Sequence, residues 1–438
     1  MMDVIKVGVM GAGTVGLATI DVLCHNQHKI QQKLGRKIQL VMVASRRIQD
    51  KNLTLPSHVQ LSDDVFAVVQ NPDIQVVVEL IGGSTDAKAL VLQAIHNKKH
   101  VITANKKLLA EYGNEIFSQA EKNKVTVRFE AAVAGGIPII KMLREGLAAN
   151  NICYIAGIIN GTSNFILSEM KLKKNTFEHA LQEAQCLGYA EADPTFDIEG
   201  HDTGHKLTLM AALAFGIPID FKHCYLEGIT HIKSEDIEFA DEIGYEVKLL
   251  GITKRSKAGI ELRVHPTLVH KDRLLASVNG VMNAVDLHSK MLGDVLYYGA
   301  GAGGLPTASA VIADLIDLAR ELTNDVKHPV PHLSYLPSEI KKLPFISIND
   351  IQSSYYLRLV IKDQVGVLSQ VAKILVAHGI SIEVMLQKAA PLLGGAQLIV
   401  LTHLCLEQHI KDAIYQLESL DEVLKQVVML RVETFHQV

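Results

Sequence analysis

The sequence contains no tryptophan, and aromatic residues make up only 5% of its 438 positions. Lysine and arginine number 43 against 47 aspartates and glutamates, which gives a formal net charge of −4. The basic residues are scattered, and they form no stripe with interleaved aromatic side chains. Because binding to a polyanion requires clustered positive charge, we expect no nucleic acid partner.

Long apolar runs are scarce as well. Runs such as residues 75–83 have the length of a strand and fall far short of the roughly 20 residues that a membrane helix needs. The chain enters a strand-like pattern by Val4, with no basic segment followed by an apolar one, so it shows no signal peptide. We therefore expect a soluble chain in the cytoplasm with no membrane partner.

Cysteine occurs five times, an odd number, and no CxxC pair suggests zinc or redox chemistry. Reduced, mostly buried thiols in a cytoplasmic protein are the simplest account. The five are Cys24, Cys153, Cys186, Cys224 and Cys405.

The most unusual stretch that is present reads GYAEADPTFDIEGHDTGHK, from Gly188 to Lys206. Pro194 and Gly200 predict that most of it is loop. Its carboxylates are Glu191, Asp193, Asp197, Glu199 and Asp202.

A helix is predicted to start at or near Asp202, because apolar residues then recur at helical spacing until Gly216. Lys206 lies one turn further along the same face. An acid and an ammonium held there could bind a substrate amine while transferring a proton. An ordinary ion pair below a solvated acidic loop explains the stretch equally well.

Residues 4–10 form a short β-branched run that leads into GAGTVG, after which LATIDVL continues at helical spacing. Strand, GxGxxG and helix in this order predict a dinucleotide site, with phosphates at the helix N-terminus. The turn consists of Gly11, Ala12, Gly13, Thr14, Val15 and Gly16.

The next predicted strand, residues 38–44, ends at Ser45, Arg46 and Arg47. NAD-preferring domains usually place an acid there for the ribose 2′-hydroxyl, whereas arginines suit a 2′-phosphate. We predict NADP(H) in preference to NAD(H), with NAD(H) still possible. The alternative is a solvated turn.

Strand and helix continue to alternate through residues 74–130, which predicts a doubly wound α/β domain. Ligands of such sheets lie beyond the carboxyl ends of the strands. Gly82-Gly83, residues 103–106 and Glu130 should therefore face one crevice. This makes Lys106 a second candidate active-site lysine, although an isolated lysine after a strand is more often surface charge.

From residue 131 the alternation stops. A glycine-rich elbow follows, and Pro138 opens an amphipathic helix. After it come a strand at 153–159, a polar turn at 160–164, a helix at 176–187 and further strands. This order predicts a mixed sheet with helices on one face. Residues 297–322 give another glycine-rich turn and a helix that returns to the first domain.

The last part, about residues 354–438, reads strand, helix, strand, strand, helix, strand, which is the ferredoxin-like order. We expect a first domain of residues 1–135 with about 300–322, a second of 136–299, a proline-rich linker of 323–353 and this C-terminal domain.

Six motifs in order, GAGTVG, TANKKLL, EAAVAGGIPII, NGTSNFIL, GYAEADPTFDIEGHDTGHKL and GAGAGGLPTAS, resemble homoserine dehydrogenase across residues 4–322. The tail resembles an ACT domain. The resemblance implies a monofunctional enzyme with a Rossmann domain, a mixed α+β catalytic and dimerisation domain and an ACT domain. It further implies NAD(P)H-dependent interconversion of L-aspartate 4-semialdehyde and L-homoserine, toward threonine, methionine and isoleucine.

The resemblance also implies roles for residues of this chain. Lys206 matches the proton donor and acceptor, and Lys106 matches a second active-site lysine. Substrate-binding acids match Glu191 and Asp202, with Asp197 close by. Cofactor-proximal turns match Gly161 and Gly303, besides the first glycine turn.

A monovalent cation site, for Na+ or K+, matches Glu130, Val133, Gly135 and Ile137, largely through backbone carbonyls. The ACT-like tail implies a homodimer or homotetramer with L-threonine or another amino acid as effector. Val365 stands where the proline of a DxPG turn is usual, which questions effector binding.

Two other readings remain open. An acylating semialdehyde dehydrogenase would need a nucleophilic cysteine, for which Cys153 and Cys186 are the candidates. A non-catalytic sensor of NADP and an amino acid would use the same domains only for binding.

Overall fold

The computed structural model describes residues 4–46, 48–50, 53–323, 330–390 and 394–435. The chain forms two compact units. The first comprises residues 1–152, 205–223 and 282–342, and the second comprises residues 153–204, 224–281 and 343–438.

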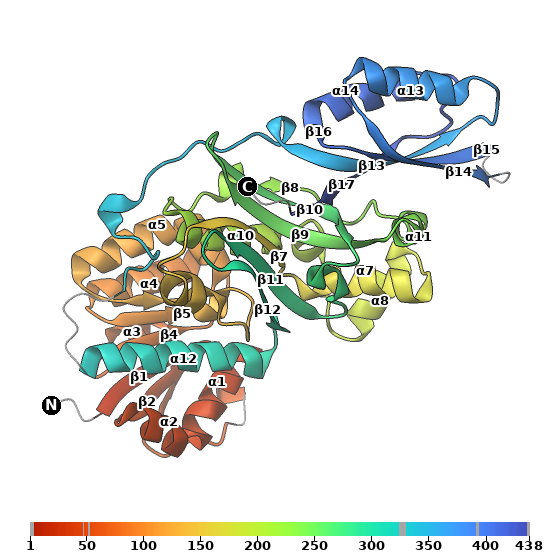
Figure 1. Cartoon of the computed structure of the whole chain (residues 1–438). Coiled ribbons are helices and arrows are strands. Elements are labelled where there is room, and N and C mark those ends of the chain that lie inside the picture. The colour runs from red at the N-terminus through yellow and green to blue at the C-terminus, as the bar shows by residue number, and fades with distance from the viewer. Residues whose placement is uncertain (1–3, 47, 51–52, 324–329, 391–393, 436–438) are drawn as a thin grey trace. The chain divides into compact units, whose positions relative to one another are not determined.

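A parallel sheet in the order β3-β2-β1-β4-β5-β6 forms the centre of the first unit (Figure 1). The order reverses beside β1, as in doubly wound dinucleotide-binding folds, so the predicted α/β class is confirmed. The strands are β1 (Val4–Met10), β2 (Lys37–Ala44), β3 (Gln60–Ser62), β4 (Val76–Glu79), β5 (His100–Thr103) and β6 (Val127–Arg128).

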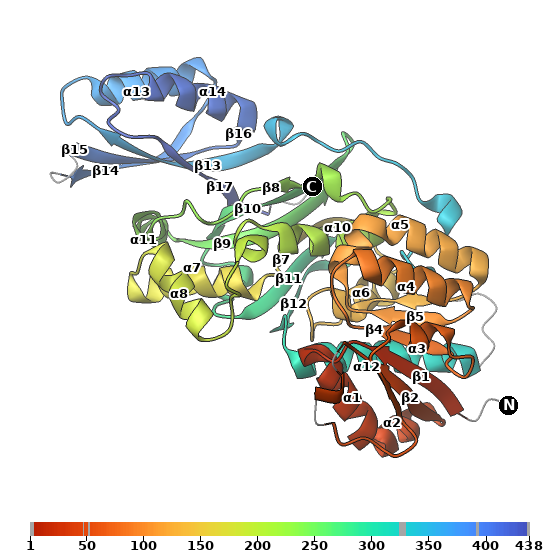
Figure 2. The same ribbon diagram turned by 180° about the vertical axis from the view of Figure 1, so that it is seen from behind.

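Helices cover both faces of this sheet (Figures 1 and 2). On one face, Val7 and Val9 of β1 pack in one buried cluster with Ile20 of α1 and with Val311 and Leu315 of α12. The late helix α12 therefore returns to the N-terminal sheet, as expected. The helices of this unit include α1 (Thr14–His25), α2 (Gln27–Leu34), α3 (Phe66–Gln70), α4 (Thr85–His96), α5 (Lys106–Asn123), α6 (Ile139–Lys141) and α12 (Gly304–Thr323).

A hairpin of β11 (Met282–Ser289) and β12 (Gly293–Ala300) completes the strands of the first unit. The helix expected after Pro138 is shorter than predicted, because α6 passes into one π-helical turn over Met142–Gly146. A Cβ on Gly146 would lie 2.6 Å from the Met142 methyl group, the flexible end of that side chain.

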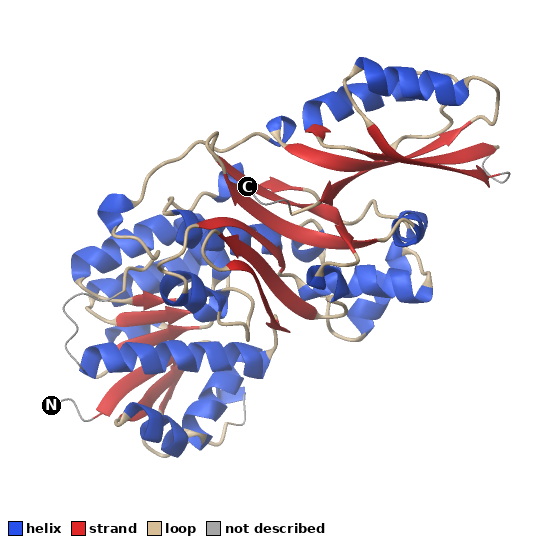
Figure 3. Cartoon of the chain, viewed as in Figure 1, coloured by secondary structure: helices blue, strands red, loops and turns tan. Residues whose placement is uncertain are grey.

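The second unit contains a mixed sheet in the order β7-β9-β10-β17-β13-β15-β14 (Figure 3). All pairings in this order are antiparallel except β10 with β17. The predicted mixed sheet is confirmed. Its strands are β7 (Ile152–Ile158), β8 (Tyr225–Leu226), β9 (Tyr245–Arg255), β10 (Ile260–His270), β13 (Gln352–Ile361), β14 (Ile382–Ala390), β15 (Gly395–Thr402), β16 (Cys405–Leu406) and β17 (Val428–Glu433).

The helices of the second unit are α7 (Gly161–Lys173), α8 (Phe177–Cys186), α9 (Thr195–Ile198), α11 (Ser234–Glu242), α13 (Val367–Ala377) and α14 (Glu407–Glu418). The last two pack on β13 and β15 in one apolar cluster. Helix α10 (His201–Phe215) begins one residue earlier than predicted. No helix among the described residues is long and apolar enough to cross a membrane.

The prediction of a polar turn at residues 160–164 was wrong, because these residues start α7. The Asn160 side chain accepts the Ser163 N–H at 2.8 Å, which caps the helix. Ser163 and Asn164 are buried in its first turns. The polar composition that suggested a turn therefore serves contacts inside the protein.

A buried ionic cluster joins the end of β17 to β9 and β10. Glu433 accepts hydrogen bonds from Lys254 at 2.8 Å and Arg263 at 2.9 Å. Burial alone would raise the pKa of Glu433, but the two cations lower it to about 2. The carboxylate is therefore ionised throughout the neutral range.

Replacing Glu433 by glutamine should lower the free energy of unfolding at pH 7 by roughly 3 kcal/mol, since a lowered carboxylate pKa stabilises the folded state. The folded pKa lies below the ordinary 4.5, so this stabilisation is complete above pH 4.5 and is lost as the pH falls toward about 2. Urea unfolding from pH 7 to 3 should show the difference between variant and parent shrinking below pH 4.5. A difference that stays constant would contradict this origin.

Candidate active site

The turn between β1 and α1 leaves open space at the helix N-terminus. Gly11 has a φ of +102°, and a Cβ there would collide with the Leu80 carbonyl. A Cβ on Gly16 would collide with the Gly11 carbonyl, whereas a Cβ on Gly13 would meet nothing within 4 Å. The first N–H groups of α1, which no side chain caps, therefore face space that suits a pyrophosphate.

The glycine turn before α12 lies beside this cradle. Gly303 has a φ of +116°, and a Cβ on Gly304 would lie 3.2 Å from the Thr14 carbonyl. Thr14 is exposed and Val15 is half-buried. Two helix N-termini, of α1 and α12, thus meet at Thr14, and the structure brings Gly303 to the predicted cofactor turn.

A buried carboxylate joins the carboxyl ends of β4 and β5. Glu79, which is fully buried, accepts the Thr103 hydroxyl at 2.6 Å, and burial raises its pKa. Asn105 caps α5, and its side chain donates to the Gly83 carbonyl at 2.6 Å. Lys106 is the first residue of α5 and is half-buried.

Glu79 was not predicted at the site, and Asn105 was predicted only as part of residues 103–106, which were expected to face the crevice. Both could have been found, because an acid at the end of an apolar strand is unusual and Asn is a preferred residue at a helix N-cap. Their contacts fix the segment that carries Lys106.

At the end of β2, Arg46 is exposed, and the Ser45 N–H donates to the Ser62 carbonyl at 3.1 Å. Arg47 lies outside the described residues. The structure therefore places one of the two predicted arginines on the surface that follows β2.

In the second unit, one amide joins two carboxylates. The Asn160 side-chain nitrogen donates to Asp197 at 2.7 Å and to Asp202 at 2.9 Å. Ser163 donates its hydroxyl to the Asp197 backbone carbonyl at 3.0 Å. The start of α7 thus holds both acids, and Asn160 is a site residue that the sequence analysis missed.

Asp202 and Lys206 lie one turn apart on α10 and are 2% and 7% exposed. A solvated ion pair on a helix surface is therefore excluded. Charged side chains with so little exposure are retained where they are paired or have chemistry to perform.

The other acids of the stretch have different surroundings. Glu191 is exposed, and its backbone carbonyl accepts the Gln185 side chain at 3.1 Å. Asp193 accepts the Thr195 N–H, and Glu199 accepts the Thr230 hydroxyl. Only Asp197 and Asp202 share the Asn160 amide.

Gly161 opens α7 in the second unit. A Cβ there would lie 2.8 Å from the Val281 carbonyl, so the absence of a side chain has a packing reason.

The loop from residue 130 to 137 carries the predicted cation ligands. The Glu130 carboxylate accepts the N–H groups of Ile140 at 2.9 Å and Lys141 at 2.7 Å, and burial together with Asp314 raises its pKa to about 8. The Glu130 and Ile137 carbonyls each accept one backbone N–H, which leaves each a second lone pair.

Val133 and Gly135 complete this loop and are buried. Gly135 has a φ of +51°, and a Cβ there would lie 2.5 Å from the Gly301 carbonyl. The donor set of neutral carbonyl oxygens fits a hard monovalent cation. Within the described ranges, no group of three His, Cys, Asp or Glu side chains could hold a metal.

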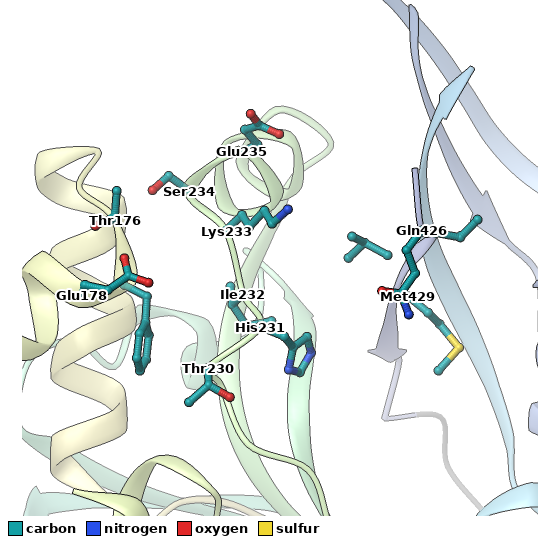
Figure 4. Close-up of a pocket in the computed structure, with 13 residues that line it drawn as sticks. Thr176, Glu178, Thr230, His231, Ile232, Lys233, Ser234, Glu235, Gln426 and Met429 are labelled. Atoms are coloured by element: carbon teal, nitrogen blue, oxygen red, sulfur yellow. The ribbon is translucent and has the colours of Figure 1, made fainter. Parts of the chain in front are cut away.

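A cavity of about 690 Å³ in the second unit lies elsewhere (Figure 4). Its walls are residues 176–178, 230–235 and 426–429, and none of the predicted site residues lines it. The candidate active-site residues are therefore not drawn from this cavity.

Known protein families match this chain over most of its length. Family models described as the homoserine dehydrogenase NAD binding domain and as homoserine dehydrogenase match residues 11–130 and 138–316. A homoserine dehydrogenase of Neisseria gonorrhoeae is 54% identical over 99% of this chain and 100% of its own length.

Solved structures give the same result. A homoserine dehydrogenase from Thiobacillus denitrificans is 51% identical, with a TM-score of 0.93 and 98% of both chains covered. One from Staphylococcus aureus is 31% identical, with a TM-score of 0.78, over 99% of this chain and 100% of that chain.

Gly13→Ala should weaken dinucleotide binding by about tenfold, equivalent to roughly 1.4 kcal/mol, because the new methyl group enters the open space at the α1 N-terminus. The melting temperature should not fall, since the φ of −76° suits alanine. Fluorescence titration with NADPH measures the affinity. Gly16→Ala is the contrasting variant and should destabilise the fold; equal affinity in Gly13→Ala and parent would contradict the assignment.

Proposed function

The chain belongs to the homoserine dehydrogenase family, and from this premise we propose that it reduces L-aspartate 4-semialdehyde reversibly to L-homoserine with NADPH. The observation that carries the proposal is the buried Asp202–Lys206 face of α10, with Asp197 joined to Asp202 through Asn160. Membership of this family argues against the two alternative functions, an acylating semialdehyde dehydrogenase with a nucleophilic cysteine and a non-catalytic sensor. The products lead toward threonine, methionine and isoleucine.

Lys206 is the proposed general acid and base. When hydride reaches the aldehyde carbon, negative charge develops on the oxygen, and the ammonium group stabilises it and donates a proton. Lysine ammonium is ordinarily protonated at neutral pH, so the reducing direction is favoured there. The oxidation requires the neutral amine and should accelerate as the pH rises.

Lys106 is the second proposed active-site lysine, and it also contacts the cofactor. The acids Asp197, Asp202 and Glu191 are proposed to bind the substrate ammonium group, which distinguishes the amino acid from simple aldehydes. The buried and half-buried positions of Asp202 and Asp197 support this role more than the exposed position of Glu191 does.

Lys206→Ala should lower kcat by about two to four orders of magnitude, because it removes the proton donor, while NADPH affinity is retained. Steady-state rates and fluorescence titration check both halves. Lys107→Ala, an exposed neighbour of Lys106, is the matched control and should keep parental activity. Near-parental turnover of Lys206→Ala would remove Lys206 from the mechanism.

NADP(H) is the proposed cofactor because Ser45, Arg46 and Arg47 follow β2 where an acid would favour NAD(H). Gly11–Gly16 and Gly303 are proposed to hold its phosphates and Gly161 to lie near it. NAD(H) remains a possible second cofactor.

Arg46→Ala should raise the KM for NADPH about tenfold and leave the KM for NADH unchanged, since only NADPH carries the 2′-phosphate. Initial rates with each cofactor measure this. A parent enzyme that prefers NADH would contradict the proposed preference for NADP(H).

A monovalent cation, Na+ or K+, is proposed to bind the carbonyls of Glu130, Val133, Gly135 and Ile137. Its charge would hold this buried loop in one conformation. The carbonyl donor set described above supports the proposal.

The C-terminal elements β13 to β17 are proposed to form an ACT domain. Their βαββαβ order with β16 added, and the strand order β17-β13-β15-β14, support this. The terminal strand β14 exposes Val384 and Met385, at 38% and 39%, which favours pairing in a homodimer or homotetramer. We propose residues 354–438 as the regulatory domain after a linker of 323–353.

The remaining boundaries proposed are residues 1–135 with about 300–322 for the cofactor domain and 136–299 for the catalytic domain. None of the five cysteines is in a disulfide, which suits a cytoplasmic enzyme. The expectation that they are mostly buried was wrong, because Cys186 is exposed and Cys24 and Cys224 are half-buried.

L-Threonine should inhibit the enzyme by binding the ACT-like domain, residues 354–438. Val365, which is fully exposed before α13, occupies the position where a proline is usual in the DxPG turn. Rates measured with added L-threonine, and with D-threonine as control, test the effect. Stronger inhibition of Val365→Pro than of the parent supports this site, whereas equal inhibition of the two proteins at every L-threonine concentration, or none in either, would exclude it.

A further inference from the structure

The acidic segment that carries Asp197 is held from two sides within the second unit. On one side, Asn160 and Ser163 bind the Asp197 carboxylate and carbonyl, as described above. On the other side, the Ile229 N–H donates to the Ile198 carbonyl at 2.9 Å, and Thr230 donates to Glu199 at 3.1 Å.

Gly228 brings the second support into close contact. A Cβ there would lie 2.6 Å from the Ile198 carbonyl, so only glycine lets the 227–230 segment approach this closely. The residue before it, Glu227, donates its N–H to the Val264 carbonyl at 2.9 Å. The support is therefore anchored to β10 through its backbone.

The Glu227 side chain is anchored separately, to the C-terminal strand β17. Arg431 donates to Glu227 at 2.7 Å and forms two hydrogen bonds with Glu407, at 2.7 and 2.6 Å. The Tyr225 hydroxyl donates to Glu227 at 2.8 Å. Arg431 is 1% exposed and Glu407 fully buried, so this network has one well-defined geometry.

We propose that Glu227, held by Arg431, is a positioning residue that sets the place of Asp197 for the substrate. The inference rests on the proposed role of Asp197 in substrate binding. Arg431 fixes Glu227, the backbone of Gly228 and Ile229 carries that placement to Ile198, and Ile198 adjoins Asp197. Through this chain of contacts the C-terminal strands bear on substrate affinity and not on the cofactor.

Figure 1 shows β17 between β10 and β13, so the strand that carries Arg431 joins the C-terminal strands to the strand that anchors Glu227. In Figure 4, Thr230 lies on the segment that faces Gln426 and Met429 across the cavity. Arg431 makes the side-chain contact from β17 to the support, through Glu227.

Glu227→Gln tests the proposal, because it keeps the shape of the side chain while Glu407 continues to balance Arg431. The KM for L-homoserine should rise about three- to tenfold, with the KM for NADP+ and kcat within about twofold of parental values. Arg431→Lys should do the same, since one ammonium cannot reproduce the guanidinium contacts. The double variant should be no worse than the poorer single variant.

Asp236→Asn is the matched control. Asp236 is fully buried and binds Arg358 of β13 at 2.6 and 3.1 Å, which joins the same C-terminal strands to α11. The Ser234 hydroxyl, at the start of α11, donates to the Asn175 carbonyl just after the C-terminal end of α7. Asn160 lies at the other end of α7. This control should lower the melting temperature without raising the KM for L-homoserine.

Equal KM changes in Glu227→Gln and Asp236→Asn, or no change in Glu227→Gln, would overturn the proposal and leave Glu227 a stabilising residue only. If Glu227→Gln and Arg431→Lys fail to fold, Tyr225→Phe removes one hydroxyl from the network and should raise the same KM about twofold. An unchanged KM there counts against the proposal.

Asp197→Asn separates the two levels. If it raises the KM for L-homoserine and Glu227→Gln does not, only the positioning role fails. If Asp197→Asn leaves that KM unchanged, the proposed substrate role of Asp197 fails and the inference fails with it.

Discussion

Two neighbouring carboxylates, Asp197 and Asp202, are bound by a single amide nitrogen, that of Asn160. Like charges brought together and partly removed from water repel each other, so the pair requires donors or a cation. One hydrogen of the amide serves each acid. The carbonyl oxygen of the same side chain caps α7, so the helix start, the acidic loop and the first turn of α10 depend on one residue.

This constraint explains why polar residues fill a buried segment. Thr162 donates to the Tyr189 carbonyl at 2.6 Å, and Ser163 donates to the Asp197 carbonyl. These two hydrogen bonds fix the acidic loop to α7 at two points. The opposite side is fixed by residues 228–230. A loop held from two sides loses little conformational entropy on binding a substrate, which favours affinity.

The dinucleotide turn could be predicted from the sequence because its causes are local. A β-branched strand, three spaced glycines and a helical repeat each constrain only their own neighbourhood, and the bounds of β1 agree with the prediction to the residue. The order of strands and helices after residue 354 could be predicted for the same reason. Lys206 could be found because its distance from Asp202 is set by helix geometry alone.

Other features could not be predicted because their causes are distant in the chain. Asn160 lies 37 residues from Asp197 and 42 from Asp202, so its role appears only in the folded protein. The parallel pairing of β10 with β17 joins segments that the sequence separates into different domains. Arg431 and Glu227, 204 residues apart, look like ordinary surface charges until folding pairs them and buries Arg431.

The most direct test of the account is the rate at which the purified protein reduces NADP+ at alkaline pH with L-homoserine as the only reductant. The account predicts saturable turnover that depends on L-homoserine and is faster with NADP+ than with NAD+. Measurable binding of both cofactors without reduction of either would contradict it.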